Sequence, residues 1–133
     1  MRRPVFSRPG PQAGNTRQRG SEWEAAAETL LQQRGLTTVA RNFHGRIGEI
    51  DLVMLDGQTL VFIEVRYRRD DGHGSGAASV IPAKQRRITF AAKRFLQKEK
   101  RYAHRACRFD VVSIGRKEGR TLMNWIKGAF NAA

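Results

Sequence analysis

The chain has 133 residues and carries 25 Lys and Arg against 12 Asp and Glu, a formal net charge of +13. This length suffices for one domain with its own core, and the positive charge favours polyanionic partners, because each neutralised phosphate releases condensed counterions. No apolar run approaches the roughly 20 residues that span a bilayer, and no helical pattern combines a basic face with a bulky apolar one. We therefore expect nucleic acid, and no membrane, as the partner.

Cysteine usage and the N-terminal residues indicate a cytoplasmic protein. The single cysteine, Cys107, excludes an internal disulfide and favours a reducing compartment. Its position beside the apolar residues of segment 108–112 predicts a buried thiol. The arginines Arg2 and Arg3 are not followed by the apolar segment of a secretion signal.

The N-terminal segment differs in composition from the rest of the chain. Residues 1 to about 19 hold three of the four prolines, two glycines and five arginines, with no acid and no hydrophobic periodicity. Such a composition buries too little apolar surface to offset the entropy lost on ordering. We predict a disordered basic arm over residues 1–19 and a single domain over residues 20–133.

The first half of this domain predicts a helix followed by strands. Apolar residues recur at helical spacing over residues 21–34. Residues 39–43 form a short candidate strand. The β-rich runs 49–55 and 59–66 are separated by the turn residues 56–58 and predict an antiparallel hairpin.

The second half predicts a loop, a second helix and a third core strand. Residues 67–79 contain three glycines and mixed charges, which is typical of a loop. Residues 82–101 carry one apolar stripe, and Pro82 suits the first turn of a helix. A core strand over residues 109–114 and a short strand or turn over residues 122–126 complete the expected order.

Two acidic residues, Asp51 and Glu64, interrupt the apolar strands of the predicted hairpin. A charge at such a position costs several kcal/mol unless it is paired or bound to a metal. A turn that pairs Met54 with Thr59 sets the two acids diagonally on one face. A four-residue loop over residues 56–59 sets them directly opposite each other, and a three-residue loop separates them. In either of the first two registers the carboxylates lie within about 5 to 8 Å of each other.

Two interpretations of this carboxylate pair stay open. Mg²⁺ is usually held by one or two carboxylates together with waters and a substrate phosphate. Asp51 and Glu64, with the carbonyl of Val65, therefore form a candidate divalent-metal site. Alternatively, both carboxylates form ion pairs with Arg66 or Arg46 at the margin of the sheet.

A set of short motifs runs through the predicted domain. The segment Gly48-Glu49-Ile50-Asp51-Leu52 is followed by Glu64-Val65-Arg66 within an apolar strand. Further motifs are, in order, Gly20-x-x-x-Glu24-x-x-Ala27, Arg41-Asn42, Val80 with Lys84, Arg108-Phe109-Asp110-Val111-Val112 and Trp125-Ile126-Lys127-x-Ala129-Phe130. Over about residues 20 to 130 the chain thus resembles the UPF0102 (YraN-type) family.

The resemblance implies a restriction-endonuclease-like α/β fold of the PD-(D/E)xK type, with a central mixed sheet of four to five strands flanked by two main helices. It implies that Asp51 and Glu64 bind Mg²⁺ or Mn²⁺, and that Arg66 and Glu24 complete the catalytic set. Arg66 occupies the position of the motif's lysine, and because arginine stays protonated it stabilises charge but cannot act as a base. Glu24 is either a third acidic member of the site or the last residue of a capping box that begins at Ser21.

The predicted second helix is strongly basic. Against one acid, Glu99, it carries eight basic residues: Lys84, Arg86, Arg87, Lys93, Arg94, Lys98, Lys100 and Arg101. We expect the first five of these to contact nucleic-acid phosphates. A charged face that only meets solvent is the alternative.

Together these features predict a nucleic-acid-binding protein that acts as a metal-dependent endonuclease and hydrolyses phosphodiester bonds, with DNA as the expected nucleic acid. Analogy with resolvases, which act as dimers, indicates branched DNA as the substrate and a homodimer as the active form. The alternative is a non-catalytic DNA- or RNA-binding module on the same fold, which the arginine at the lysine position favours. The chain has no glycine-rich phosphate loop, so we expect no nucleotide cofactor.

Overall fold

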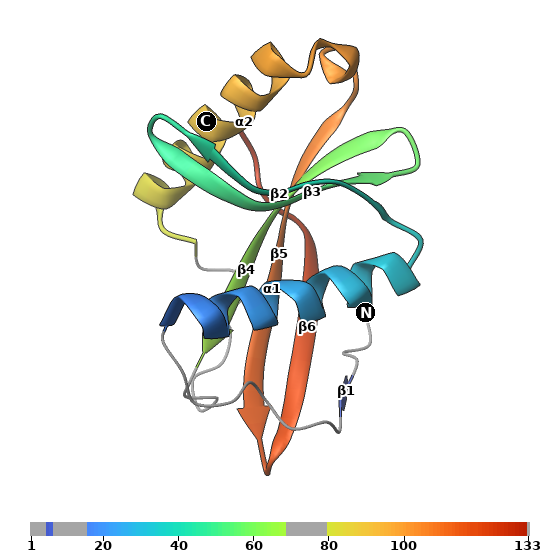
Figure 1. Ribbon diagram of the computed structural model, residues 1–133, viewed down its shortest axis with the longest axis vertical. Helices are drawn as coiled ribbons and strands as arrows, with labels where there is room; N and C mark the ends of the chain where they lie inside the picture. The colour runs from blue at the N-terminus through green and yellow to red at the C-terminus, as the bar shows by residue number, and fades with distance from the viewer. Residues whose placement is uncertain (1–4, 7–15, 69–79, 133) are drawn as a thin grey trace.

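Two α-helices, a short 3₁₀ helix and six strands make up the described part of the chain in the computed structural model, which covers residues 5–6, 16–68 and 80–132 (Figure 1). In chain order they are β1 (Val5–Phe6), α1 (Thr16–Gln33), β2 (Thr37–Gly45), β3 (Gly48–Asp56), β4 (Thr59–Arg68), α2 (Pro82–Lys98), the 3₁₀ helix (Lys100–Tyr102), β5 (Cys107–Lys117) and β6 (Arg120–Phe130).

The strands form one mixed sheet in the order β1-β6-β5-β4-β3-β2. β4 and β5 are parallel, and the other neighbouring strands are antiparallel. A parallel pair requires a crossover connection, which is the stretch containing α2, whereas antiparallel neighbours can be joined by tight turns. Five long strands and two main helices confirm the predicted α/β class, and the arrangement is consistent with a nuclease-like fold.

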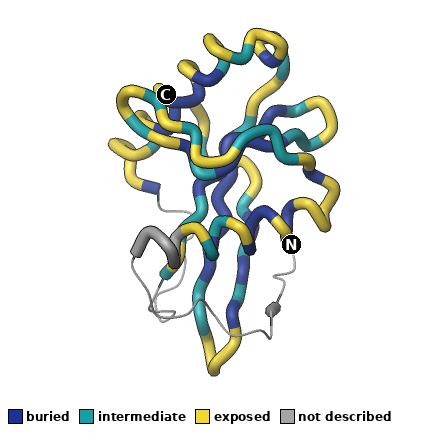
Figure 2. Tube along the Cα trace, in the orientation of Figure 1, coloured by how far each residue is buried: buried dark blue, intermediate teal, exposed yellow. Residues whose placement is uncertain are grey.

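The two helices pack on opposite faces of the sheet. One hydrophobic cluster joins α1 to the sheet and includes Leu31 and Met54. The other joins α2 to the sheet and includes Phe95 and Val53. Val53 and Met54 are consecutive, so the strand alternation sends neighbouring side chains to opposite faces. The central strands are therefore buried on both sides, as Figure 2 shows.

The N-terminal part is more regular than the sequence predicts. α1 begins at Thr16 instead of residue 21, so the end of the predicted arm is helical. Val5–Phe6 also pairs with β6 and forms a short edge strand. Residues 1–4 and 7–15 of the predicted arm lie outside the described residues, and the division between an arm and a domain stays a prediction.

Other boundaries differ as well. β6 is an 11-residue strand instead of a short closing piece, because it pairs with β5 along most of its length. α2 ends at Lys98 and is followed by the 3₁₀ helix, while residues 69–79 of the expected loop lie outside the described residues. The expectation of a buried Cys107 is wrong: this residue opens β5 and its side chain is exposed. Within the described ranges, neither helix has the length and apolar character needed to cross a membrane.

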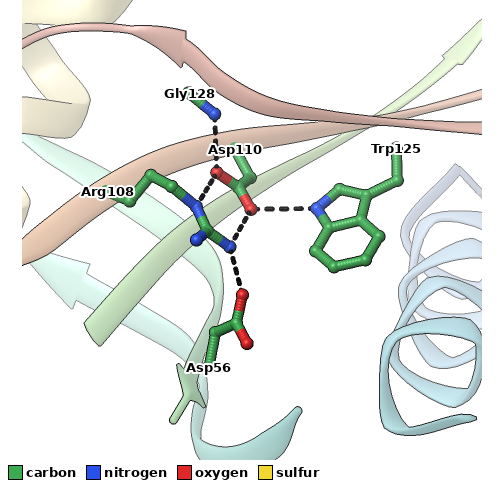
Figure 3. A network of polar contacts seen from close by, with 5 residues as sticks. All are labelled: Asp56, Arg108, Asp110, Trp125 and Gly128. Atoms are coloured by element: carbon green, nitrogen blue, oxygen red, sulfur yellow. Dashed lines mark hydrogen bonds and ion pairs between the residues drawn. The ribbon is translucent and has the colours of Figure 1, made fainter. Parts of the chain in front are cut away.

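Asp110 is a fully buried carboxylate that organises the C-terminal strands (Figure 3). It accepts hydrogen bonds from Arg108 Nε at 2.8 Å and Nη2 at 3.0 Å. Trp125 Nε1 donates at 2.9 Å and the Gly128 N–H at 3.0 Å. Arg108 also donates to Asp56 Oδ2 at 2.9 Å. The buried charge is thus balanced, and the network links β5 to β6 and to the end of β3.

Candidate active site

The hairpin of β3 and β4 sets the two acids of the sequence motif against each other. The backbone ladder between these strands ends with Leu52 opposite Ile63. The next step of the same register brings Asp51 opposite Glu64. The directly opposed register is therefore the one adopted, and the diagonal register is wrong.

The regular strand pattern is interrupted at Asp51. Ile50 belongs to the hydrophobic cluster under α2, whereas Leu52 belongs to the cluster under α1, although residues two apart in a strand normally share a face. The backbone N–H of Val65 donates a hydrogen bond to Asp51 Oδ2 at 2.8 Å. The Asp51 carboxylate therefore accepts a hydrogen bond from β4 at the point where the backbone pairing of β3 with β4 ends.

Glu64 is paired with a lysine from α2. Its side chain is 7% exposed, and its Oε2 atom lies 2.5 Å from Lys84 Nζ. Lys84 stands in the first turn of α2, and about half of its side chain is exposed. The sequence predicts Lys84 only as part of the basic surface, since its contact with Glu64 depends on the path between β4 and α2.

α1 adds a third carboxyl group to the cluster. Glu24 forms hydrogen bonds with the side chains of Asp51 and Asn42. The capping-box interpretation of Glu24 is wrong, because α1 begins at Thr16 and Ser21 therefore lies inside the helix. Asn42, in β2, is a contact that the sequence analysis did not single out as a site residue, although it lies in one of the family-like motifs.

Burial and neighbouring acids disfavour the ionisation of Asp51 and Glu24. Desolvation, reinforced by repulsion from Glu64, raises the pKa of Asp51 to about 8, against the opposing effect of the Val65 N–H. Desolvation also raises the pKa of Glu24, opposed by its hydrogen bond with Asp51 and reinforced by repulsion from Glu49 and Glu64. A nearby cation would favour the charged forms of both groups.

Comparison with known proteins places the chain in a family. The family model described as "Uncharacterised protein family UPF0102" matches residues 23–114. A UPF0102 protein of Xanthomonas oryzae pv. oryzae (strain PXO99A) is 51% identical over 115 residues, which are 86% of this chain and 93% of that protein. A UPF0102 protein of Pseudomonas syringae pv. syringae (strain B728a) is 45% identical over 122 residues, 91% of this chain and 99% of that protein.

The chain belongs to the UPF0102 family. This confirms the resemblance inferred from the motifs. The region matched by the UPF0102 model contains Glu24, Asp51, Glu64 and Lys84, so the acidic cluster is built within the part of the chain that defines the family.

The other residues considered for the site of this UPF0102 protein lie on β3, on β4 and in the turn between β2 and β3. Arg66 follows Glu64 by two positions in β4 and is partly buried, and its catalytic role stays a prediction. Arg46 is exposed in the turn between β2 and β3. Glu49 is also exposed, and its Oε2 lies 3.1 Å from His44 Nδ1. Lys84 is a cation partner of Glu64 that the ion-pair interpretation did not include.

A divalent-cation site at these acids stays a prediction. No group of three or more His, Cys, Asp or Glu side chains is arranged as a metal-ligand cluster within the described ranges. Asp51 and Glu64 are instead hydrogen-bonded to each other, and Glu64 contacts Lys84. Mg²⁺ commonly uses only one or two carboxylates and completes its shell with water. The fit to Mg²⁺ or Mn²⁺ therefore rests on Asp51 and Glu64, with Glu24 beside them.

The basic residues expected to bind nucleic acid share one property in the structure. All five are exposed on α2: Lys84, Arg86, Arg87, Lys93 and Arg94. The buried side of the same helix carries Ile88, Ala91 and Phe95, which pack against the sheet. Packing of the apolar stripe thus leaves these five side chains on the solvent side of the helix, where Lys84 also pairs with Glu64.

Proposed function

We propose that this UPF0102 protein is a Mg²⁺- or Mn²⁺-dependent endonuclease that hydrolyses phosphodiester bonds in DNA. The observation that carries the proposal is the cluster of Glu24, Asp51 and Glu64, which lies against Lys84 at the start of a basic helix. Titratable groups with strongly shifted pKa values cluster at functional sites, because catalytic acids and bases need pKa values matched to their task. The acidic groups suit a hard cation such as Mg²⁺, and the neighbouring basic groups suit a phosphate.

Asp51 and Glu64 would hold the metal through their carboxylate oxygens. When bound, the metal would lower the pKa of a coordinated water and offset the negative charge that develops on the phosphate. The hydrogen bond from the Val65 N–H orients Asp51. Lys84 balances the charge of Glu64 in the absence of other cations.

Glu24 is suited to accept the proton of the attacking water. A positioned glutamate is a common general base, and burial raises the pKa of Glu24 above its usual range in the metal-free protein. Its interactions with Asp51 and Asn42 place it at the cluster. The base would therefore come from α1, whereas the metal ligands come from the sheet.

Lys84 and Arg66 would stabilise the charge of the reacting phosphate. Lys84 carries a half-exposed ammonium group beside Glu64, so it can reach a ligand that enters from solvent. Arg66 adds a permanently charged planar group at the position of the motif's lysine. We assign Lys84, from the helix, the charge-stabilising role that the motif gives to a lysine on the strand.

Cleavage assays test this proposal. Labelled single-stranded, duplex, flapped and four-way DNA is incubated with Mg²⁺, Mn²⁺ or EDTA and with the variants Asp51→Asn and Glu64→Gln. We expect metal-dependent cutting that each variant reduces by about 100-fold or more, while the matched control Glu99→Gln retains it. Cutting that persists in both site variants would show that these acids are not the catalytic centre.

A non-catalytic nucleic-acid-binding module is the second candidate function. Two features favour it: Glu64 Oε2 is already held by Lys84, and arginine replaces the motif's lysine. Salt-sensitive binding of the same substrates, without cutting in either metal, would support this candidate. A preference for four-way DNA and a dimer in sedimentation would support the branched substrate and homodimer expected by analogy; the cytoplasmic location stays a prediction from the sequence.

A further inference from the structure

Phe90 and Ile47 are large apolar side chains on the surface of the basic helix and its neighbouring turn. Phe90, in α2, is 54% exposed, and Ile47, between β2 and β3, is 56% exposed. They border a groove of about 300 Å³, whose lining consists of Arg46, Ile47, Phe90, Lys93, Arg94 and Gln97. Figure 2 shows the turn and the outer side of α2 as exposed chain. Apolar groups framed by cations in this way indicate a binding surface.

Phe90 also lines a second hollow. This hollow has a volume of about 180 Å³ and is lined by Arg86, Thr89, Phe90 and Lys93. Phe90 is thus shared by two hollows, both bordered by positive charge. Such a ring can be covered by a flat ligand whose neighbouring groups are anionic.

Two glycines hold the turn against α2 and thereby maintain the groove. A Cβ atom at Gly48, where φ is +137°, would lie 2.7 Å from the carbonyl oxygen of Arg87. A Cβ atom at Gly45 would lie 3.3 Å from Ala91 Cα. The turn therefore approaches the helix more closely than side chains would allow. This contact sets the positions of Arg46 and Ile47 relative to Phe90.

We propose that this groove binds an unpaired nucleobase, which stacks on Phe90 while Arg46, Lys93 and Arg94 contact the adjoining phosphates. The proposal rests on the proposed function and deepens it, because it names single-stranded nucleic acid as the form that is bound. Every base presents a flat π face, so stacking on an aromatic ring tolerates any sequence. In a duplex these faces are covered by neighbouring base pairs, so Phe90 contributes little to the binding of a duplex.

Charge favours nucleic acid over a second copy of this chain in the groove. The two hollows beside Phe90 contain the cations Arg46, Arg86, Lys93 and Arg94 and no acid. The chain as a whole carries a formal charge of +13. Two copies that met through this surface would place like charges together, whereas a polyanion supplies the opposite charge.

A third hollow lies between the groove and the acidic cluster. It has a volume of about 380 Å³ and is lined by His44, Gly45, Gly48, Glu49, Lys84, Arg87 and Ile88. Lys84 is thus shared between this hollow and the ion pair with Glu64. Phe90 follows Lys84 by about 9 Å along the helix axis, at 1.5 Å per residue. In this proposal a strand held at Phe90 continues toward Arg87 and Lys84, both of which line the third hollow.

Binding measured without cleavage tests the inference. Fluorescein-labelled single strands and blunt duplexes of equal length are titrated in EDTA with wild type, Phe90→Ala and Phe90→Trp. We expect Phe90→Ala to weaken single-strand binding about tenfold and duplex binding less than about twofold, and Phe90→Trp to retain single-strand binding. Because Phe90 is largely exposed, equal melting temperatures will show that the variants remain folded.

A charge comparison supplies the second measurement. The double variant Lys93→Ala/Arg94→Ala should reduce the slope of log affinity against log salt by about 1.4 for single strands, at roughly 0.7 per phosphate contact. The matched control Lys117→Ala/Arg120→Ala alters two exposed cations at the β5–β6 turn and should leave the slope unchanged.

The outcomes separate this inference from the proposed function. Equal single-strand affinity of wild type and Phe90→Ala would overturn the inference that the groove binds a base. Cleavage that depends on Asp51 and Glu64 would still support the endonuclease. Phe90-dependent binding without cleavage would support the groove and overturn the endonuclease. A dimer that Phe90→Ala dissociates would identify the groove as a contact between two copies and overturn the inference.

Discussion

Lys84 Nζ lies 2.5 Å from Glu64 Oε2, in an ion pair between the first turn of α2 and strand β4. The lysine side chain is 53% exposed and the glutamate 7%. A buried acid is thus balanced by a cation that still reaches solvent. This relationship links the acidic cluster to the surface on which a phosphate would arrive.

Removal of Lys84 should lower both stability and activity. In Lys84→Ala the Glu64 carboxylate loses its charged hydrogen-bond donor, so we expect the free energy of unfolding to fall by about 1–2 kcal/mol in urea denaturation. Lys84→Arg should retain most of the stability because it preserves the charge. The matched control Lys117→Ala, at an exposed position, should change stability by less than about 0.5 kcal/mol. If Lys84→Ala behaves like this control, the ion pair contributes nothing to folding.

Protonation of Asp51 should make the stability depend on pH. Its pKa is raised from 3.8 to about 8 in the folded protein, so between these values the folded state keeps a proton that the unfolded chain has lost. The resulting stabilisation is fully present below the lower value and disappears as the pH rises toward the upper one. We expect the melting temperature to fall between about pH 5 and about pH 8, and to fall less in Asp51→Asn. Parallel pH profiles of the two proteins would contradict this assignment.

A divalent cation should compete with that proton. Metal binding requires the deprotonated carboxylate, so Mn²⁺ should raise the melting temperature more at about pH 8 than at about pH 5. A concentration of about 100 times the dissociation constant adds about 2.7 kcal/mol. Mn²⁺ should no longer raise the melting temperature of Glu64→Gln, whereas it should still raise that of Asp56→Asn. Calorimetric titration in two buffers of different ionisation enthalpy measures the proton release, and its absence would argue against Asp51 as the ligand.

Asp110 should contribute to stability far more than its neighbour Asp56. Asp110→Asn removes the buried charge that faces Arg108 and weakens the bonds from Trp125 and Gly128. We expect the free energy of unfolding to fall by about 3 kcal/mol. Asp56→Ala, whose side chain is 32% exposed in wild type, should cost less than about 1 kcal/mol. Denaturant unfolding compares the two, and equal costs would mean that the network does not depend on Asp110.

Local patterns in the sequence were enough to predict the main elements and to single out two residues of the candidate site. Two β-rich runs separated by turn residues identified the β3–β4 hairpin, and helical spacing identified α1 and α2, because these signals express the local geometry of each element. Asp51 and Glu64 were recognisable because a charge within an apolar strand requires a partner. The basic character of α2 and the family membership were also readable without the fold.

Element ends and burial were less accessible to sequence reasoning. The start of α1 at Thr16 and the length of β6 were missed, because helix ends carry weak signals and a strand is extended by its pairing partner. The exposure of Cys107 depends on its place at the edge of the core, which its apolar neighbours do not reveal.

The composition of the candidate site was decided by tertiary structure. Sequence alternation allowed two registers for Asp51 and Glu64, and only the pairing of Leu52 with Ile63 distinguishes them. Glu24 reaches Asp51 because α1 packs across the sheet, and Lys84 reaches Glu64 because α2 packs over β2 and β3 with its first turn near Glu64. These contacts join residues that are distant in sequence, so they follow from how the elements pack and not from any local propensity.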